Sequence, residues 1–228
     1  MKVCSSTALA SLSVLLLLSL FLCVDAYPQK IVLIRHAEKP ADDNDPNLSE
    51  KGYHRATAFI KYFNGTHGLF TRPSAFFAMG SRIDPTEKDP PGIKTVKTLR
   101  AIETVQPSAE WLRVPIFKQF IKERPDRLFT FIEDEQKLHQ DIFSFNNTVV
   151  ICWEHDDLND IFLAKFGLPS EYIPKAWPGH VYDMNYVLTF STNGKLKEFD
   201  IVLQHLLPSD AAQLDNKDLI KKQHVVLH

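Results

Sequence analysis

Cysteine is scarce in this chain, and its distribution excludes a disulfide-stabilised fold. The 228 residues contain three cysteines, of which Cys4 and Cys23 lie in the first 26 residues. If that segment is removed, Cys152 remains alone, and the folded part must be stable without an internal cross-link. Cys152 lies in the apolar run 149–153. We therefore expect a buried, unreactive thiol there rather than a nucleophile.

An excess of positive charge is also absent. The formal net charge is −2, and removal of residues 1–26 leaves it unchanged because one basic and one acidic residue, Lys2 and Asp25, leave together. Nucleic acid is therefore not an expected partner. Internal repeats and low-complexity tracts are absent beyond residue 26. The 44% of apolar residues is ordinary for a globular protein, and we expect one domain over residues 27–228.

Residues 1–26 have the pattern of a secretory signal peptide. Lys2 gives a positive start, the run 12–24 is almost wholly apolar, and the small Ala26 predicts cleavage before Tyr27. An uncleaved membrane anchor is disfavoured because the apolar run is short for a span and no basic cluster follows it. After cleavage we expect no stable membrane insertion. The expected location is outside the cell or in a lysosomal or other endomembrane lumen.

Three sequons for N-glycosylation, at Asn47, Asn64 and Asn146, agree with export. Asn64 and Asn146 fall between predicted elements and are plausible acceptors on the surface. Asn47 lies close to the residues discussed below as a candidate site, which makes it a doubtful acceptor. The sequence therefore predicts an exported glycoprotein, with its oligomeric state left open.

Hydrophobic patterning predicts alternating strands and helices. Strands are predicted at 31–34, 75–79, 148–153, 186–190 and 196–203. Helices are predicted at 48–63, at 95–112 with a kink or break at Pro107, at 133–143 and at 158–166. Residues 113–131 are ambiguous, and the last 20 or so residues are predicted as a loosely held tail. This alternation is typical of an α/β fold, a three-layer α/β/α sandwich with a mostly parallel sheet.

Two pairs of polar residues come directly after strongly predicted strands. Arg35 and His36 follow one strand, and Glu154 and His155 follow another. In parallel sheets, functional residues gather at the carboxyl ends of strands. A neutral imidazole can attack phosphorus, and the guanidinium fork of arginine matches phosphate oxygens. His155 is the expected second imidazole, which donates to a phosphate oxygen.

A predicted helix adds Arg100 and, one turn later, Thr104, so that both can face one site. A metallohydrolase that uses His36 and His155 is a third-ranked alternative, because the sequence shows no spacing typical of metal ligands. We therefore expect neither a metal nor another cofactor.

Four segments together resemble the histidine phosphatase superfamily, also called phosphoglycerate-mutase-like. Residues 34–40, with Arg35-His36-Ala37, are similar to its Arg-His-Gly motif, and residues 48–56 to the helix start that follows it. Residues 99–104 resemble its Arg-Ala-x-x-Thr helix, and residues 153–155 the strand that delivers its second histidine. The four matches keep the family's order along residues 31 to about 166.

The resemblance implies a phosphoric monoester hydrolase without a metal, acting through a phosphohistidine on His36. Arg35 and Arg100 would bind phosphate, Thr104 would belong to the substrate-binding set, and His155 would complete the pocket. Asp42 stands where mutase-like members carry Asn, which puts mutase activity in doubt. The substrate would be a small phosphorylated molecule, with its class left open.

The sequence does not mark the proton donor uniquely. Asp156, directly after His155, is the preferred residue, and Glu123, Glu38 and Glu154 are the alternatives. If no acid is correctly placed, the alternative function is an exported binding protein on the same fold with little turnover. His180 is read as a surface residue, and Trp177 and Tyr182 as core residues that could instead line a substrate cleft.

Overall fold

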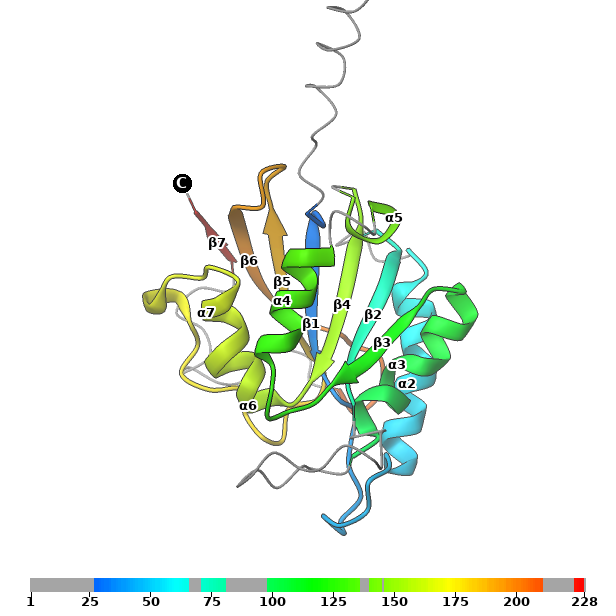
Figure 1. Ribbon diagram of the computed structural model, residues 1–228. Helices are drawn as coiled ribbons and strands as arrows, with labels where there is room; N and C mark the ends of the chain where they lie inside the picture. The colour runs from blue at the N-terminus through cyan, green and yellow to red at the C-terminus, as the bar shows by residue number, and fades with distance from the viewer. Residues whose placement is uncertain are drawn as a thin grey trace, which may run out of the picture.

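A mixed β-sheet forms the centre of the protein (Figure 1). The computed structural model describes residues 27–65, 71–80, 98–135, 140–144, 146–210 and 224–227. Their strands form a sheet in the order β3-β2-β4-β1-β5-β6-β7. The strands are β1 (Lys30–Arg35), β2 (Pro73–Met79), β3 (Ile116–Phe120), β4 (Thr148–Trp153), β5 (Met184–Phe190), β6 (Leu196–Leu203) and β7 (His224–Val226).

The sheet is parallel on one side of β1 and antiparallel on the other. The pairs β1–β4, β4–β2 and β2–β3 are parallel, whereas β1–β5, β5–β6 and β6–β7 are antiparallel. The predicted hairpin of β5 and β6 turns at Gly194, whose φ of 74° favours glycine. The α/β class predicted from the sequence is confirmed, with a sheet that is mixed and partly parallel.

Helices cover both faces of this sheet (Figure 1). In the view of Figure 1, α2 and α3 lie on one face, and α4, α6 and α7 lie on the other. The helical segments are α2 (Glu50–Phe63), α3 (Arg100–Leu112), α4 (Asp126–Glu135), α5 (Gln140–Phe143), α6 (His155–Asp157), the π-helix η1 (Leu158–Phe162), α7 (Leu163–Lys165) and the 3₁₀ turn η2 (Ser170–Tyr172). Among the described residues, none of the helices has the length and apolar character needed to span a bilayer.

The structure corrects several predicted elements. The ambiguous stretch contains β3, and the predicted tail contains β7, which pairs with β6. Helix α3 continues through Pro107 to Leu112, because buried side chains on both sides of the proline, such as Val105 and Ala109, hold it against the sheet. The predicted helix 133–143 is divided between α4 and α5, with 136–139 outside the described residues.

The predicted signal peptide, residues 1–26, also lies outside the described residues. Strands β1 and β4 form the centre of the core, and every side chain of β4 is buried. Cys152 is fully buried and unpaired, and burial raises the pKa of its thiol well above its ordinary value. The thiol predicted to be inert is therefore neutral and inaccessible.

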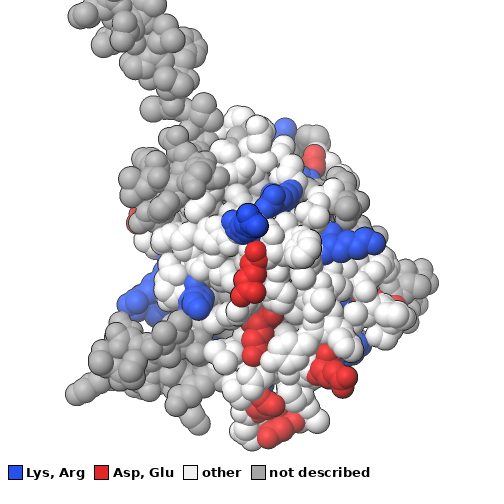
Figure 2. All heavy atoms as spheres, turned by 90° about the vertical axis from the view of Figure 1, so that its right-hand side faces the viewer, with Lys and Arg blue, Asp and Glu red and all other residues white. Residues whose placement is uncertain are grey.

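One face of the surface is drawn in Figure 2, which shows the right-hand side of Figure 1. Acidic and basic side chains both occur on it, separated by larger areas of other residues. The charges of this face are therefore mixed in sign.

Candidate active site

His36 is the first residue after β1, at the carboxyl end of a strand between β4 and β5. Its backbone N–H donates to the carbonyl of Trp153 over 3.1 Å, which extends the pairing with β4 by one residue. The imidazole is 7% exposed, and Nδ1 lies 2.7 Å from the carbonyl oxygen of Ala37. Because a carbonyl only accepts, this contact puts the proton on Nδ1 and leaves the lone pair on Nε2.

The surroundings of His36 keep its ring neutral. Burial lowers the pKa of His36 to about 3, and the positive charges of Arg35, Arg100 and His155 add to this effect against the opposing hydrogen bond to Ala37. These charges act on the ring because β1 and β4 run in parallel, with Arg35 opposite Trp153, so the residues after both strands meet at one edge. The charges of Arg35, Arg100 and His155 therefore all act on His36.

Arg35 is 3% exposed and held from one side by the segment before β5. Its Nη1 donates to the carbonyls of Gly179 and Val181, over 2.7 Å and 3.1 Å. The carbon Cζ of the guanidinium lies 3.9 Å from the centre of the Tyr182 ring. The Nε atom is buried and has no hydrogen-bond partner among the described residues. A buried N–H without an acceptor is costly unless a ligand accepts it, so Arg35 has the contacts of an anion-binding residue.

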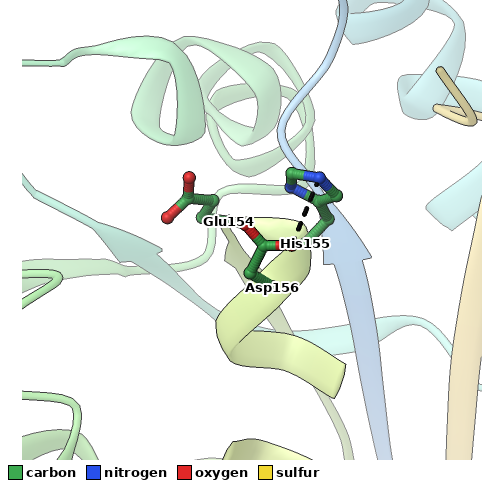
Figure 3. Close-up of side chains that lie close together, drawn as sticks. All are labelled: Glu154, His155 and Asp156. Atoms are coloured by element: carbon green, nitrogen blue, oxygen red, sulfur yellow. Dashed lines mark ion pairs between the residues drawn. The ribbon is translucent and has the colours of Figure 1, made fainter. Parts of the chain in front are cut away.

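His155 is the first residue of α6, and Glu154 separates it from the end of β4. Its Nδ1 is buried without a hydrogen-bond partner among the described residues, and its Nε2 lies 3.5 Å from Oδ1 of Asp156 (Figure 3). Burial lowers the pKa of His155, and Arg35 adds to this, while Asp156 opposes it. A phosphate dianion bound near Arg35 and His155 would raise the pKa of His155 again and favour a ring that donates a hydrogen bond to the phosphate.

Arg100 is the first residue of α3, and its guanidinium holds the loop after His36. Its Nε donates to the carbonyl of Asn47 over 3.2 Å, and its Nη2 donates to the carbonyls of Asp43 and Asp45. The charge of Arg100 nevertheless reaches His36, whose pKa it lowers. Arg100 thus holds the loop 43–47, and its binding of phosphate stays a prediction.

Thr104 has a different role from the substrate contact expected from the sequence. Its side chain is fully buried; Oγ1 donates to the carbonyl of Arg100 over 2.7 Å and accepts the backbone N–H of Ala37 over 2.8 Å. Both functions of the hydroxyl are thus used within the protein. The structure assigns Thr104 to the support of the backbone beside His36.

Glu38, one of the proposed proton donors, belongs to a buried ion pair. Its carboxylate accepts from Nε and Nη2 of Arg55, over 3.0 Å and 2.8 Å. Burial alone would raise the pKa of Glu38, but the hydrogen bonds and charge of Arg55 outweigh burial and hold it below its ordinary value. A carboxylate held ionised in this way is a poor general acid.

The other candidate acids are distributed unequally around His155. Glu154 forms an ion pair with Lys122, and its carboxylate points away from the His155 ring (Figure 3). Glu123 is half-buried in the turn between β3 and α4. Asp156 has a side chain that is 65% exposed and contacts His155. Asp156 Oδ1 lies 3.5 Å from Nε2 of the candidate catalytic His155, which keeps it as the preferred donor.

Glu154, His155 and Asp156 also offer three possible metal-ligand atoms within 4.8 Å of one another (Figure 3). The Lys122 ammonium already neutralises Glu154, and the charges of Arg35 and Lys122 both act on His155. Positive neighbours disfavour a second cation at this position. The donor set fits a metal poorly.

The start of α2 explains the second sequence motif. Ser49 caps the helix, since its Oγ accepts from the N–H of Gly52 over 3.1 Å and donates to the carbonyl of Glu38 over 3.0 Å. A Cβ at Gly52 would lie 2.4 Å from that same carbonyl oxygen. The glycine therefore allows α2 to pack directly on the backbone that follows His36.

Sequence reasoning undervalued the segment 177–182. Its Gly179 and Val181 carbonyls bind Arg35, Tyr182 stacks on the guanidinium, and a Cβ at Gly179 would lie 3.5 Å from Nε2 of His155. Trp177 is buried as expected, and His180 is exposed. The signal was the turn sequence Trp-Pro-Gly before an aromatic residue, but its contact with Arg35 spans more than 140 positions in the sequence.

Among the described residues, a hollow of about 520 Å³ lies away from His36. Its walls include Tyr27, which precedes β1, and Phe190 and Gly194 of the β5–β6 hairpin. Because His36 follows β1 and Tyr27 precedes it, this hollow lies at the opposite end of the strand from the candidate site. His36 and His155 instead follow the carboxyl ends of the neighbouring strands β1 and β4.

Comparison with known proteins gives structural similarity at low sequence identity. No protein-family model and no curated protein matches the chain. Bacillus stearothermophilus YhfR is 13% identical, with a TM-score of 0.47, over 78% of this chain and 97% of that protein. The protein histidine phosphatase SixA complexed with tungstate is 11% identical, with a TM-score of 0.48, over 77% and 97%.

A mycobacterial glucosyl-3-phosphoglycerate phosphatase in complex with inorganic phosphate is 12% identical, with a TM-score of 0.46, over 77% of this chain and 96% of that protein. These structural similarities span most of this chain and nearly the whole of each of those proteins.

Proposed function

We propose that this protein is a phosphatase that hydrolyses phosphomonoesters through a phosphohistidine on Nε2 of His36. The observation that carries the proposal is the pairing of a nucleophile with unsatisfied donors. His36 presents a neutral ring with a bare Nε2, and Nε of Arg35 and Nδ1 of His155 are buried without partners among the described residues. This is the arrangement that an oxyanion next to a nucleophile requires.

The reaction would proceed in two steps. Nε2 of His36 attacks phosphorus, the bond to the ester oxygen breaks, and the leaving oxygen takes a proton from Asp156. Water then attacks the phosphohistidine, the N–P bond breaks, and the proton released by water passes to the Asp156 carboxylate. Arg35, Arg100 and the Nδ1–H of His155 would stabilise the charge on the phosphoryl oxygens in both steps.

The direct test is hydrolysis of a generic aryl phosphate by the purified chain. We expect phosphate release that is resistant to a chelator, blocked by vanadate and lost in His36→Ala. Protein quenched in alkaline denaturant, where the N–P bond of phosphohistidine survives, should carry a label from ³²P-substrate on His36. Release that is unchanged in His36→Ala, or that requires an added metal ion, would overturn the proposal.

A binding protein with little turnover is the second candidate. It is favoured by the engagement of two possible acids in ion pairs, Glu38 with Arg55 and Glu154 with Lys122. It predicts that inorganic phosphate binds but that aryl phosphate is not hydrolysed. Asp156→Asn distinguishes the two. If the protein is an enzyme, this variant should lose activity toward substrates with poor leaving groups but keep its affinity for phosphate.

We further propose that the chain is exported and glycosylated. The support is the pattern of residues 1–26 and the exposure of Asn64 and Asn146. Asn47 is less suited, because it is half-buried and its amide donates to Asp45 over 2.8 Å. Mass spectrometry of the protein expressed in a secretory host should find Tyr27 at the N-terminus and glycans at Asn64 or Asn146.

A further inference from the structure

The segment 177–182, called the arginine loop below, has a closed shape of its own. The indole N–H of Trp177 donates to the carbonyl of Val181 over 2.9 Å, and the N–H of Val181 donates to the carbonyl of Pro178 over 3.0 Å. Trp177 is 2% exposed and packs against the ring of Tyr186 in β5, with 4.7 Å between ring centres. The loop is therefore fixed to the sheet.

This loop holds one end and one face of the Arg35 guanidinium. Both contacts of Nη1 are to its carbonyls, those of Gly179 and Val181, and the Tyr182 ring covers the flat face at 3.9 Å. Two carbonyls and an aromatic ring together fix the rotation of a planar group. The carbonyl of Val181 accepts from both Trp177 and Arg35, so it links the indole directly to the guanidinium.

The opposite edge of the guanidinium is left for a ligand. Nε–H and one N–H of Nη2 point in the same direction in any arginine and can bind two oxygens of one oxyanion. In Arg35, Nε is the buried atom without a partner among the described residues, although the whole residue is only 3% exposed. The edge of the guanidinium that can bind an oxyanion, with Nε and Nη2, therefore differs from the end that the loop holds through Nη1.

We propose that Trp177 is a positioning residue for phosphate binding, acting through the Val181 carbonyl to turn the free edge of Arg35 toward the phosphoryl group beside His36. This inference rests on the proposed function. The loop orders the guanidinium before the substrate arrives, which reduces the entropy lost on binding. Tyr182 supports the same orientation by stacking, and neither aromatic residue has to touch the reacting atoms.

The test measures the affinity of the full chain for inorganic phosphate by calorimetry. Trp177→Phe keeps an aromatic side chain but removes the indole N–H that binds the Val181 carbonyl, and we expect phosphate to bind about threefold to tenfold more weakly. The matched control is Tyr186→Phe, which loses a 3.1 Å hydrogen bond to Asn159 in the same packed unit, away from Arg35. Its phosphate affinity should equal that of the unmodified protein.

A double-mutant cycle with Arg35→Lys separates positioning from general damage. Lysine has no fork, so the effect of Trp177→Phe on phosphate affinity should vanish in the Arg35→Lys background. If Trp177→Phe fails to fold, Tyr182→Leu in the same cycle replaces it. Equal weakening in both backgrounds, or none in either, overturns the inference.

The outcome also distinguishes failure of this inference from failure of the proposed function. If the unmodified chain binds no phosphate and releases none from aryl phosphate, the proposed function is wrong. If it binds phosphate and Trp177→Phe binds equally well, only the role of the loop is wrong.

Discussion

The hydroxyl of Thr104 accepts the backbone N–H of Ala37 over 2.8 Å and thereby fixes the residue next to His36. The same residue, Ala37, supplies the carbonyl that sets the tautomer of the His36 ring. A helix on one face of the sheet thus controls which imidazole nitrogen is free. The geometry of the nucleophile therefore depends on packing between α3 and the end of β1.

Replacement of Thr104 by valine tests this relationship. Valine has a similar shape but cannot accept the N–H of Ala37, and an unsatisfied buried N–H costs roughly 1–3 kcal/mol of stability. We expect that loss in urea denaturation, together with a fall in kcat. Thr104→Ser keeps the hydroxyl and is the matched control; a full loss of activity in Thr104→Ser would contradict the explanation.

The pH dependence of the reaction follows from the depressed pKa of His36, about 3. The ring is neutral above that value, so the nucleophile should persist from neutrality down to about pH 5. The measurement is the single-turnover rate of phosphohistidine formation, with circular dichroism to verify folding. A rate that collapses near pH 6.5 while the protein stays folded would disagree with a buried, neutral His36.

The same shift makes His36 a source of acid sensitivity in folding. Its pKa is lower in the folded chain than in the unfolded chain, so the unfolded state binds more protons between about pH 6.5 and 3. The free energy of unfolding should therefore fall as the pH drops through this window. In His36→Asn this dependence should be smaller, as measured by urea denaturation at a series of pH values.

Arg55 should be the most sensitive position of the ion pairs around the site. It is 1% exposed and binds both Glu38 and Asp210, each through charged hydrogen bonds. Arg55→Met would leave two carboxylates buried without their cation, at a cost of about 3–5 kcal/mol. Lys51→Met removes an exposed cation 3.4 Å from the same Glu38 and should cost less than about 1 kcal/mol.

The measurement is the free energy of unfolding from urea denaturation. Equal losses for Arg55→Met and Lys51→Met would contradict the greater importance of the buried ion pairs.

The contribution of these ion pairs to stability depends on pH. Arg55 holds the pKa values of Glu38 and Asp210 below normal, against the raising effect of burial. Their contribution to stability is thus present above the ordinary carboxyl pKa and is lost as the pH falls through the lowered values.

Two effects act in opposite directions on the stability of Gly52→Ala, so the sign of the change shows which is larger. Helix propensity alone would make alanine more stable by about 1 kcal/mol. The new Cβ would lie 2.4 Å from the Glu38 carbonyl oxygen, so α2 must shift, and we expect a net loss of about 1–3 kcal/mol with reduced activity. His54→Ala, exposed on the same helix, controls for helix propensity in the thermal unfolding assay.

The sequence by itself determined the elements that depend on local pattern. The apolar runs of β1 and β4, followed by the pairs Arg35-His36 and Glu154-His155, were sufficient to predict both histidines at the carboxyl ends of strands. The capped start of α2 and the buried Cys152 were likewise predictable, because capping and dense apolar composition are local signals. β3 was missed because its alternation is weak, with two of its five residues exposed.

Tertiary structure alone decided how each polar group is used. Thr104 and Arg100 share a helix face in the sequence, but Thr104 supports Ala37 whereas Arg100 also holds the loop 43–47. Glu38 is two residues from His36, yet its ion pair with Arg55 keeps it from acid chemistry. Hydrogen bonds between groups far apart in the chain decide which donors remain free. Spacing in the sequence carries no record of those partners.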